Sequence, residues 1–330
     1  MTKSLGLVLL ACAVVAAAFL SLVVGTRDLP FATIWQALVA FDPASVDHLV
    51  ISELRLPRTV IGLLAGAALG VAGAVVQGMT RNPLADPGIL GVNSGAALFV
   101  VFGIQVFGLT TLTGYVWFGL AGAALAAVVV HLIGSLGRGG ATPMKLALAG
   151  TAFSAVVGSL TTAVLLTDLT TFEDFRFWQV GSLVGRGMDV AVQGVPFLAL
   201  GALLAFGAAR SLNALALGED VATSWGLNVR SARILCGVSV VLLCGAATAM
   251  AGPIGFLGLV VPHVARLITG PDHRWLLPYS ALLAALLLLL ADVLGRVLLP
   301  SGEVQVGLVT AVIGGPVFVL LARRRKVAEL

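Results

Sequence analysis

The distribution of charge constrains this chain more than any other feature of its sequence. Residues 87–137 form a run of 51 without a single Asp, Glu, Lys or Arg. Other uncharged stretches are 59–80, 146–167, 190–209, 234–265, 275–291 and 304–322. A helix that crosses a lipid bilayer needs about 20 apolar residues. With 10% charged and 59% hydrophobic residues, a chain of 330 residues lacks the polar side chains for a water-facing surface. The sequence therefore predicts an integral membrane protein, built of helices because lipid offers no partners for backbone N–H and C=O groups.

Ten membrane spans are expected, in a single transmembrane domain that covers residues 1–330 without a soluble domain. The first follows Lys3 and resembles a signal peptide, but we interpret it as an uncleaved helix because many spans follow. The eighth contains three glycines and two prolines, which predict a short or broken helix. The ten spans are 4–24, 58–80, 91–108, 114–135, 143–167, 190–210, 231–250, 252–268, 275–295 and 304–322.

The positive charges predict an orientation. An even number of spans places both termini on one side, and the basic tail 323–326 marks that side as cytoplasmic. Of the 19 Lys and Arg residues, 13 then fall on the cytoplasmic side and six on the outside. Arg55 and Arg58 stand together on the outside, against this bias.

A weak internal repeat is present. Two arginines and two glycines recur at a constant shift of 175 residues, and the two helices that carry them enter the membrane from opposite sides. This pattern is typical of inverted repeats in transporters and relates spans 2–5 to spans 7–10, although chance matches in a glycine-rich chain are an alternative. The pairs are Arg55 with Arg230, Arg58 with Arg233, Gly62 with Gly237, and Gly70 with Gly245.

Two groups of charged residues lie at the outer ends of spans. Arg55 and Arg58 flank Pro57 at the expected start of a helix, where the helix dipole disfavours cations. They either anchor the helix to lipid headgroups or bind carboxylates of an external partner. Asp292 lies four residues before Arg296, so an ion pair on one helix face is expected. A buried carboxylate used for ion coupling is the alternative.

Three polar or aromatic segments between spans have both a structural and a functional interpretation. Residues 81–94 contain prolines and glycines that break a helix, as a plain loop or as a gate. Residues 172–178 are rich in aromatic side chains, typical of an interfacial helix or of a vestibule that holds a bulky ligand. Residues 215–229 carry helix start signals at Gly218, Glu219 and Asp220 and a stop signal at Gly226, which fit either a surface loop or a short helix moved by a cytosolic motor.

Several function classes are disfavoured. The three cysteines stand in apolar contexts and no Cys/His spacing indicates a metal site. None of the three lysines lies in a phosphate-binding loop, and no nucleophile and base are paired, so we expect neither an enzyme nor a cofactor in this chain. An ion-coupled secondary transporter or a membrane enzyme would need ionisable groups within the spans, and the cores lack them. The net charge of +4 reflects cytoplasmic loops and does not indicate nucleic acid.

Long motifs in a constant order carry a family resemblance. The chain resembles the permease subunit of the type II ABC importers for iron–siderophore complexes, haem and cobalamin, and it is most similar to the ferric-siderophore branch. The motifs are LRLPRTVIGLLAGAALGVAGAVVQ at 54–77, RNPLADPGILGVNSGA at 81–96, FRFWQVGSL at 175–183, GPIGFLGLVVPHVAR at 252–266 and ADVLGRVLLPSGEVQVGLVTAVIGGPVF at 291–318.

The resemblance implies an ATP-driven importer in the bacterial plasma membrane. Its other parts would be a second permease subunit, identical or homologous, two cytosolic ATPase subunits that bind ATP and Mg, and an external binding protein that delivers a ferric siderophore. Haem or cobalamin is the alternative cargo.

The resemblance also assigns roles to single residues. Arg55, Arg58 and Arg296 match arginines that dock the binding protein. Gly218, Glu219, Asp220 and Gly226 match the segment, about 212–229, that couples to the ATPase. Asn82, Leu84 and Thr142, the last in the turn 139–142, match the cytoplasmic gate.

Overall fold

The computed structural model describes residues 2–25, 29–109, 111–137, 142–299 and 302–323, and the regular secondary structure in these ranges is helical. Ten helices correspond one to one with the predicted spans: α1 (Lys3–Val23), α4 (Leu56–Thr80), α5 (Val92–Phe107), α6 (Leu112–Gly134), α7 (Pro143–Thr167), α9 (Met188–Gly207), α12 (Val229–Ala251), α13 (Leu257–Thr269), α14 (His273–Val297) and α15 (Val306–Arg323). The basic residues 324–326 of the predicted cytoplasmic tail lie outside the described residues.

The remaining helices are short and connect the spans. They are α2 (Phe31–Val39), α3 (Val46–Leu49), the π-helix η1 (Val50–Arg55), the 3-10 helix η2 (Pro87–Leu90), α8 (Leu169–Gln179), α10 (Ala209–Ala216) and α11 (Glu219–Ser224).

Helix length and hydropathy confirm the multi-pass membrane fold. Within the described residues, seven helices are long and apolar enough to cross a membrane, and three shorter apolar helices accompany them. Two of the shorter helices, α5 and α13, each follow an irregular segment that contains glycine and proline. Proline and glycine interrupt helical hydrogen bonding, so these two spans begin inside the bundle rather than at its edge.

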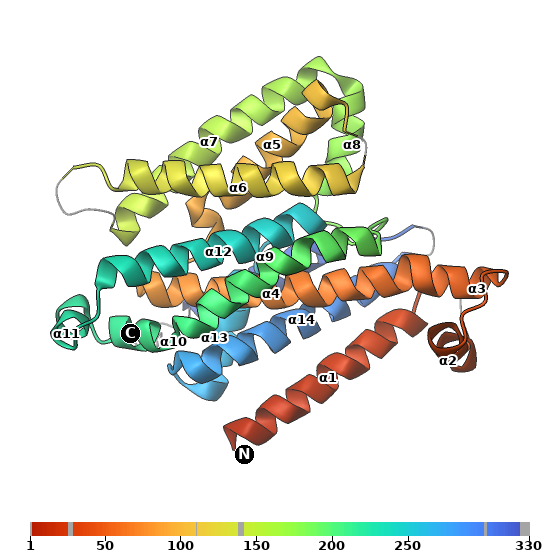
Figure 1. The fold of residues 1–330 in the computed structure, drawn as a ribbon, viewed down its shortest axis with the longest axis horizontal. Coiled ribbons are helices and arrows are strands. Elements are labelled where there is room, and N and C mark those ends of the chain that lie inside the picture. Colours follow the sequence, from red (N-terminus) through yellow and green to blue (C-terminus); the bar gives the residue numbers. More distant parts are fainter. Residues whose placement is uncertain (1, 26–28, 110, 138–141, 300–301, 324–330) are drawn as a thin grey trace.

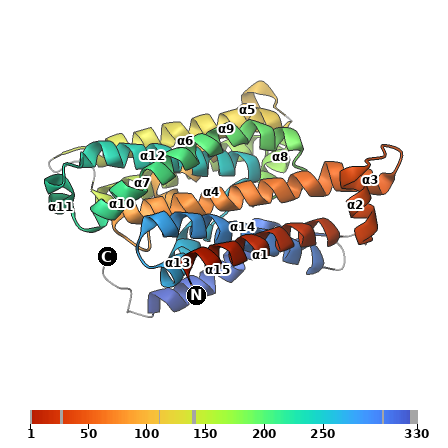
Figure 2. The same cartoon turned by 60° about the horizontal axis from the view of Figure 1, so that its bottom comes forward.

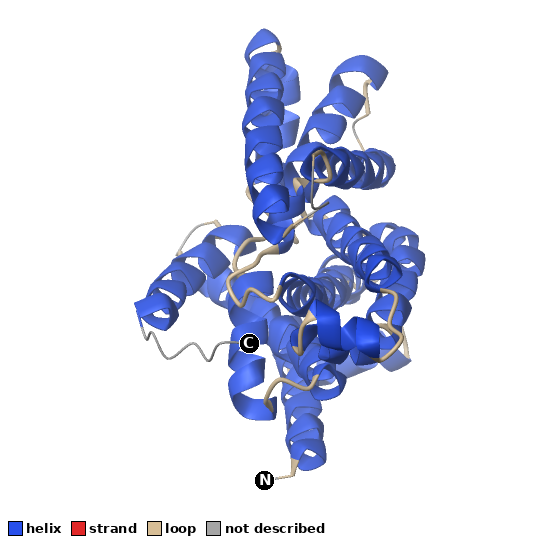
Figure 3. Cartoon of the chain, turned by 90° about the vertical axis from the view of Figure 1, so that its left-hand side faces the viewer, coloured by secondary structure: helices blue, strands red, loops and turns tan. Residues whose placement is uncertain are grey.

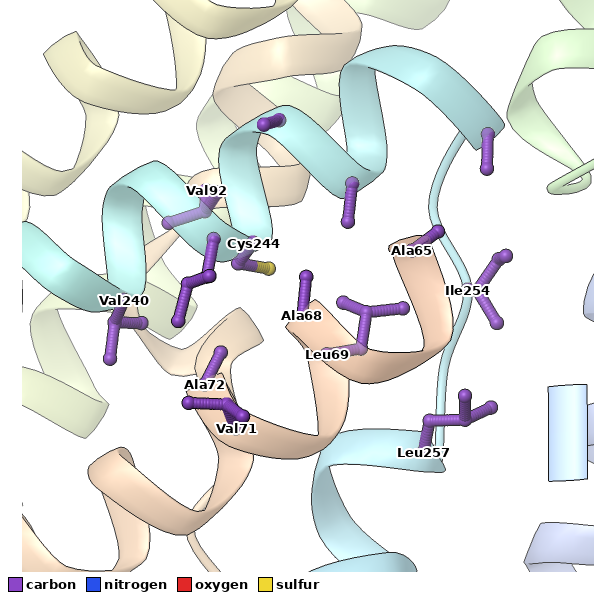
Figure 4. Packing of buried hydrophobic residues seen from close by; sticks show 14 of the residues in the cluster. Ala65, Ala68, Leu69, Val71, Ala72, Val92, Val240, Cys244, Ile254 and Leu257 are labelled. Atoms are coloured by element: carbon purple, nitrogen blue, oxygen red, sulfur yellow. The ribbon is translucent and has the colours of Figure 1, made fainter. Parts of the chain in front are cut away.

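Helix α4 occupies the centre of the bundle and packs against α12, α13 and α14. A Cβ placed on Gly66 would lie 2.7 Å from the Cα of Ala285, and one on Gly70 would overlap the carbonyl oxygen of Ser280. Because these glycines lack side chains, the backbones of α4 and α14 touch directly, as small residues allow in membrane helices. Small residues of α4 and α12 likewise fill the adjoining core, around Ala68, Ala72 and Cys244 (Figure 4).

The bundle has two distinct ends (Figures 1 and 2). We call the end that holds the start of α1 together with α10 and α11 the α11 end, and the end that holds α2, α3 and α8 the α8 end. Tyr279 near the start of α14 donates a hydrogen bond to the Lys3 carbonyl at 2.7 Å, which ties the N-terminus to the α11 end. Helices α5 to α8 form a group on one side of α12 and α4, and α1 lies on the opposite side (Figure 3 looks at the bundle from the α11 end).

The two halves of the chain use matching helix pairs. Helix α4 of the first half packs on α14 of the second half. Its counterpart α12, in the second half, packs on α6 of the first half, which is the counterpart of α14. Within each half the second, third and fourth spans contact one another, α5 with α6 and α7, and α13 with α14 and α15. This correspondence is what the predicted inverted repeat of spans 2–5 and 7–10 requires.

The second span matches α4 to within two residues, but the helix extends further toward the N-terminus than predicted. The chain is helical from Val46 to Thr80, through α3, η1 and α4. Pro57 lies in the first turn of α4, where the preceding π-helix ends. A proline lacks an N–H group, and here the change from π to α hydrogen bonding absorbs the missing donor. Arg55 and Arg58 therefore lie inside a continuous helix, away from its positive end.

Candidate docking cluster, coupling helix and gate

The arginines predicted for docking meet at the α8 end in one polar cluster. Arg58 on α4 donates to both carboxylate oxygens of Asp292 on α14, at 2.8–3.1 Å, and to Glu303 at 2.6 Å. Arg296 binds the same Asp292 from one helical turn away. The predicted Asp292–Arg296 pair is thus confirmed, and one buried carboxylate pairs with two guanidinium groups from different helices. Such charge-assisted forked bonds are among the stronger polar contacts in proteins.

The cluster also holds helix α1. Arg55 donates to the carbonyls of Leu22 and Val23 at 2.6 and 2.7 Å, and Arg296 donates to those of Ser21 and Val24 at 2.6 and 3.0 Å. These carbonyls belong to the last turn of α1, where helical carbonyls lack partners of their own. The arginines therefore cap α1 and join it to α4 and α14.

Burial changes the interpretation of these arginines. A docking role on the outside implies exposed arginines, and this expectation is wrong: Arg55 and Arg296 are buried, and the Arg58 side chain is only 11% exposed. The partners of Arg55 and Arg58 lie far away in the sequence and could not be identified from spacing alone. Contact with a binding protein stays a prediction for all three, and Arg58 is the one that reaches the surface, beside the partly exposed Glu303.

Helix α8 differs in part from the expected interfacial helix. Its Phe175 and Trp178 side chains are buried in the main core, while Phe172 is exposed. The expectation that this aromatic run faces the interface is therefore wrong for Phe175 and Trp178, because the helix presents alternate faces to the core and to its surroundings. The helix begins at Asp168, which accepts hydrogen bonds from Thr170 and Thr171, and these bonds lower the pKa of Asp168 to about 2.

Arg186, in the loop after α8, is one of the six basic residues that the sequence places on the outside. It is buried, and its Nε donates to the Ser182 carbonyl at 3.2 Å. Its Nη1 has no hydrogen-bond partner among the described residues. Burial lowers its pKa to about 10. Only packing, and no local sequence pattern, indicates this group.

The predicted coupling segment forms α10 and α11 at the α11 end. Helix α11 starts directly after Gly218 (φ 113°) and is followed by Gly226 (φ 80°), as the start and stop signals predicted. Glu219 forms an ion pair of 2.5 Å with Arg233 of α12. Asp220 and Trp225 are exposed. The structure thus presents a short exposed helix that is tied to the bundle through one acidic residue, while the next carboxylate stays accessible.

A second tie fixes α10 to the bundle. Asn213 donates to Asp272 at 2.7 Å and accepts from the backbone N–H of His273 at 2.8 Å. Asp272 caps the first turn of α14, and the buried His273 ring lies against Gly78 of α4. Helix α10 thus contacts α11 on one side and α4 and α14 on the other. Sequence reasoning missed this contact because Asn213 lies about 60 residues from its partners.

The predicted gate residues lie on a re-entrant segment and on α7. Asn82 accepts a hydrogen bond from the Leu84 backbone at 3.0 Å, and Leu84 is exposed. The chain then turns back into the bundle, where Pro87 packs against Gly258 of α13. Thr142 caps α7 by accepting from Lys145 N–H, while residues 139–141 of the predicted gate turn lie outside the described residues. Helix η2 packs beside α7, which joins the two predicted gate elements.

Nothing in the described part of the chain resembles a metal centre, because no three or more His, Cys, Asp or Glu residues gather there.

Comparison with known proteins identifies the family. The ferric enterobactin transport system permease protein FepD of Escherichia coli is 44% identical over 97% of this chain and 94% of its own length. The hemin transport system permease protein HmuU of Yersinia pestis is 36% identical over 92% of this chain and 90% of its own length. A solved structure described as an inward-facing conformation of a metal-chelate type ABC transporter superposes with a TM-score of 0.84 at 29% identity, covering 96% of this chain and 98% of the other. The FecCD transport family signature matches residues 13–324, and the chain belongs to that family.

Proposed function

We propose that this chain is the permease subunit of an ATP-driven importer that carries a ferric siderophore into the cell. The observation that supports this most is its 44% identity, over nearly the full length, with a ferric enterobactin permease. Haem or cobalamin is the alternative cargo, because a hemin permease and a cobalamin permease are 36% and 37% identical over similar lengths. The higher identity favours the siderophore.

The proposed orientation places the α11 end in the cytoplasm of a bacterium and the α8 end outside its plasma membrane. The excess of Lys and Arg that sequence analysis assigned to one side supports this orientation. Both termini are then cytoplasmic. A substrate-binding protein approaches the α8 end, and two ATPase subunits approach α11. A second permease subunit, identical or homologous, completes the translocation pathway.

Force would pass from one end to the other through packed helices. In this proposal, the ATPase moves α11, and Asn213 and the Glu219–Arg233 pair pass the motion to α14 and α12. The directly contacting backbones of α4 and α14 carry it to the arginine cluster at the other end. Docking of the binding protein would engage Arg58 in exchange for Glu303, while Arg55 and Arg296 hold α1 in place.

The gate proposal concerns Asn82, Leu84 and Thr142 at the α11 end. A cysteine placed at Leu84 should differ in accessibility to a membrane-impermeant thiol reagent between the ATP-bound and nucleotide-free transporter. Equal labelling in both states would contradict a role for this segment in gating.

The function is tested by transport in proteoliposomes that contain the whole transporter. Uptake of an iron-loaded siderophore from the binding protein should require ATP on the α11 side and should persist when the proton gradient is collapsed. Uptake driven by a proton gradient without ATP would overturn the importer assignment. Uptake of haem but of no ferric siderophore would overturn only the cargo.

The coupling role is tested by replacing both Glu219 and Asp220 with lysine. We expect ATP hydrolysis to continue while transport falls to background, because the acidic start of α11 loses both its tie to Arg233 and its exposed carboxylate. Binding-protein affinity at the α8 end should stay unchanged. Full transport by the double variant would refute the coupling role.

A further inference from the structure

A side groove opens between α6 and α12 near the α11 end. Its cavity of about 440 Å³ is apolar apart from Thr80, His131 and Arg233. Several of the apolar side chains that line it are also exposed, so the groove opens sideways from the bundle instead of being sealed within it. These exposed lining residues are Val128, Leu132, Ile234 and Val238.

The polarity of the groove changes along its length. Arg233 lies four residues after the start of α12, and His131 lies three residues before the end of α6. The lining residues Leu242 and Ala124 lie nine and seven residues farther into the spans. At 1.5 Å per residue the apolar walls extend roughly 10–14 Å beyond the cationic rim. A phospholipid has this same order of groups, an anionic phosphate at the membrane surface and an acyl chain beneath it.

A glycine keeps the groove open. Gly237 lies one helical turn after Arg233 on α12, and a Cβ placed on it would meet no atom within 4 Å. An apolar slot of this kind, open to the side in a membrane, fills with hydrocarbon because water there would find few polar partners.

Arg233 also holds the start of α11. Its Nη2 pairs with Glu219 at 2.5 Å, and both side chains are partly exposed, so a second oxyanion has access to the same guanidinium. Arginine presents five N–H donors and binds phosphate with a forked geometry.

From these observations we propose that one anionic phospholipid binds in this groove. Its phosphodiester contacts Arg233 and His131, its acyl chain lies along Gly237, and the shared Arg233 makes the position of α11 sensitive to the lipid. The effect on α11 rests on the proposed coupling function, but the lipid site itself does not.

The test uses the full-length chain in phosphatidylcholine nanodiscs with a trace of a phospholipid that carries a diazirine in its acyl chain. Crosslinks mapped by mass spectrometry should fall in 124–132 and 234–242. Phosphatidylglycerol should label these segments about fivefold more than phosphatidylcholine, as expected for one cation near the headgroup. The variant Arg233→Gln should remove this preference and leave the weaker labelling by phosphatidylcholine.

A matched pair of glycine variants tests the groove itself. Gly237→Phe should fill it and abolish labelling of both segments. Gly207→Phe, at an exposed glycine whose Cβ would likewise meet nothing within 4 Å, should leave labelling unchanged. Labelling that survives Gly237→Phe overturns the groove, and equal labelling by both lipids in the unaltered protein overturns the headgroup contact. Competition by millimolar glycerol phosphate would show that Arg233 binds free anions, which also overturns the lipid site. Because the assay needs neither cargo nor ATPase, its failure is distinguishable from failure of the proposed function.

Discussion

Helices α4 and α12 carry arginine and glycine at the same spacing and use them in opposite ways. On α4, Gly62 lies against the Leu289 side chain of α14, which an added Cβ would approach to 3.1 Å, and Arg58 is enclosed between Asp292 and Glu303. On α12, the counterpart of Arg58 is Arg233, which pairs with the exposed Glu219, and the counterpart of Gly62 is Gly237, which opens onto the side groove. At this pair of glycines the first half of the repeat closes its seam and the second leaves it open, whereas Gly70 and its counterpart Gly245 both lie against a neighbouring helix.

The partner helix explains the difference. Helix α14 presents small groups to α4, with Ser280, Ala284 and Ala285 in contact with the glycines. Helix α6 presents the small Ala123 to Gly245 of α12, but it lines the groove beside Gly237 with Val128, His131 and Leu132. Backbone contact requires small residues on both helices, so glycine on one of them is not sufficient. A rigid seam then suits transmission of force, and an open one suits binding of a small ligand.

The largest effect on folding is expected from adding a side chain to a glycine where two helices touch, compared with a glycine that faces open space. Gly70→Val should abolish the yield of folded protein, because its side chain would collide with the backbone of α14, which cannot rotate away. Gly237→Val should change the melting temperature little, since its Cβ meets open space. Detergent-solubilised yield and thermal melting measure both variants. Similar behaviour of the two would break the proposed contrast.

The next largest effect is expected from removing the carboxylate that pairs with Arg58, compared with removing the one that pairs with Arg233. Asp292→Asn leaves Arg58 and Arg296 buried with weakened partners, and we expect a loss of about 3 kcal/mol in stability. Glu219→Gln breaks an exposed pair and should cost at most about 1 kcal/mol. Urea titration of the purified protein gives both values, and equal losses would show that burial of the α8-end cluster contributes nothing.

Arginine-to-lysine exchange tests geometry with charge held constant. Arg58→Lys cannot bridge Asp292 and Glu303 with a forked group and should lose about 1.5 kcal/mol of stability. Arg233→Lys should stay within about 0.5 kcal/mol of the unaltered protein. Affinity for the binding protein, measured at two salt concentrations, should fall only for Arg58→Lys. Unchanged affinity would remove Arg58 from the proposed docking surface.

The smallest effect concerns the short helices at the two ends. Helix α8 has an acidic cap at Asp168, whereas α11 begins at Gly218 without a side-chain cap. Because the folded-state pKa of Asp168 is lowered from 3.8 to about 2, its stabilisation is complete above pH 4 and is lost as pH falls toward 2. Asp168→Asn should therefore accelerate amide exchange in α8 at pH 7, with a smaller difference from the unaltered protein at pH 3. A difference that is independent of pH would refute the cap as its cause.

Much of the fold follows from local sequence. Uncharged runs longer than a bilayer is thick leave a helix as the only stable conformation, so each of the ten predicted spans coincides with a helix. The bounds of α11 were predictable for a similar reason, because glycine at positive φ ends a helix whatever surrounds it. The π-helical entry to α4 was not, since it depends on how the turns around Pro57 pack.

Which side chains face one another was decided by tertiary structure alone. The sequence by itself determined that Asp292 and Arg296 share a helix face, because four residues separate them. It could not determine that Arg58, 234 residues from Asp292, completes the same cluster, or that Asn213 binds the start of α14. Nor could it distinguish Gly70, which touches α14, from Gly237, which faces the groove. Hydropathy and spacing act within one helix, whereas burial and pairing depend on the neighbour that packing brings to each face.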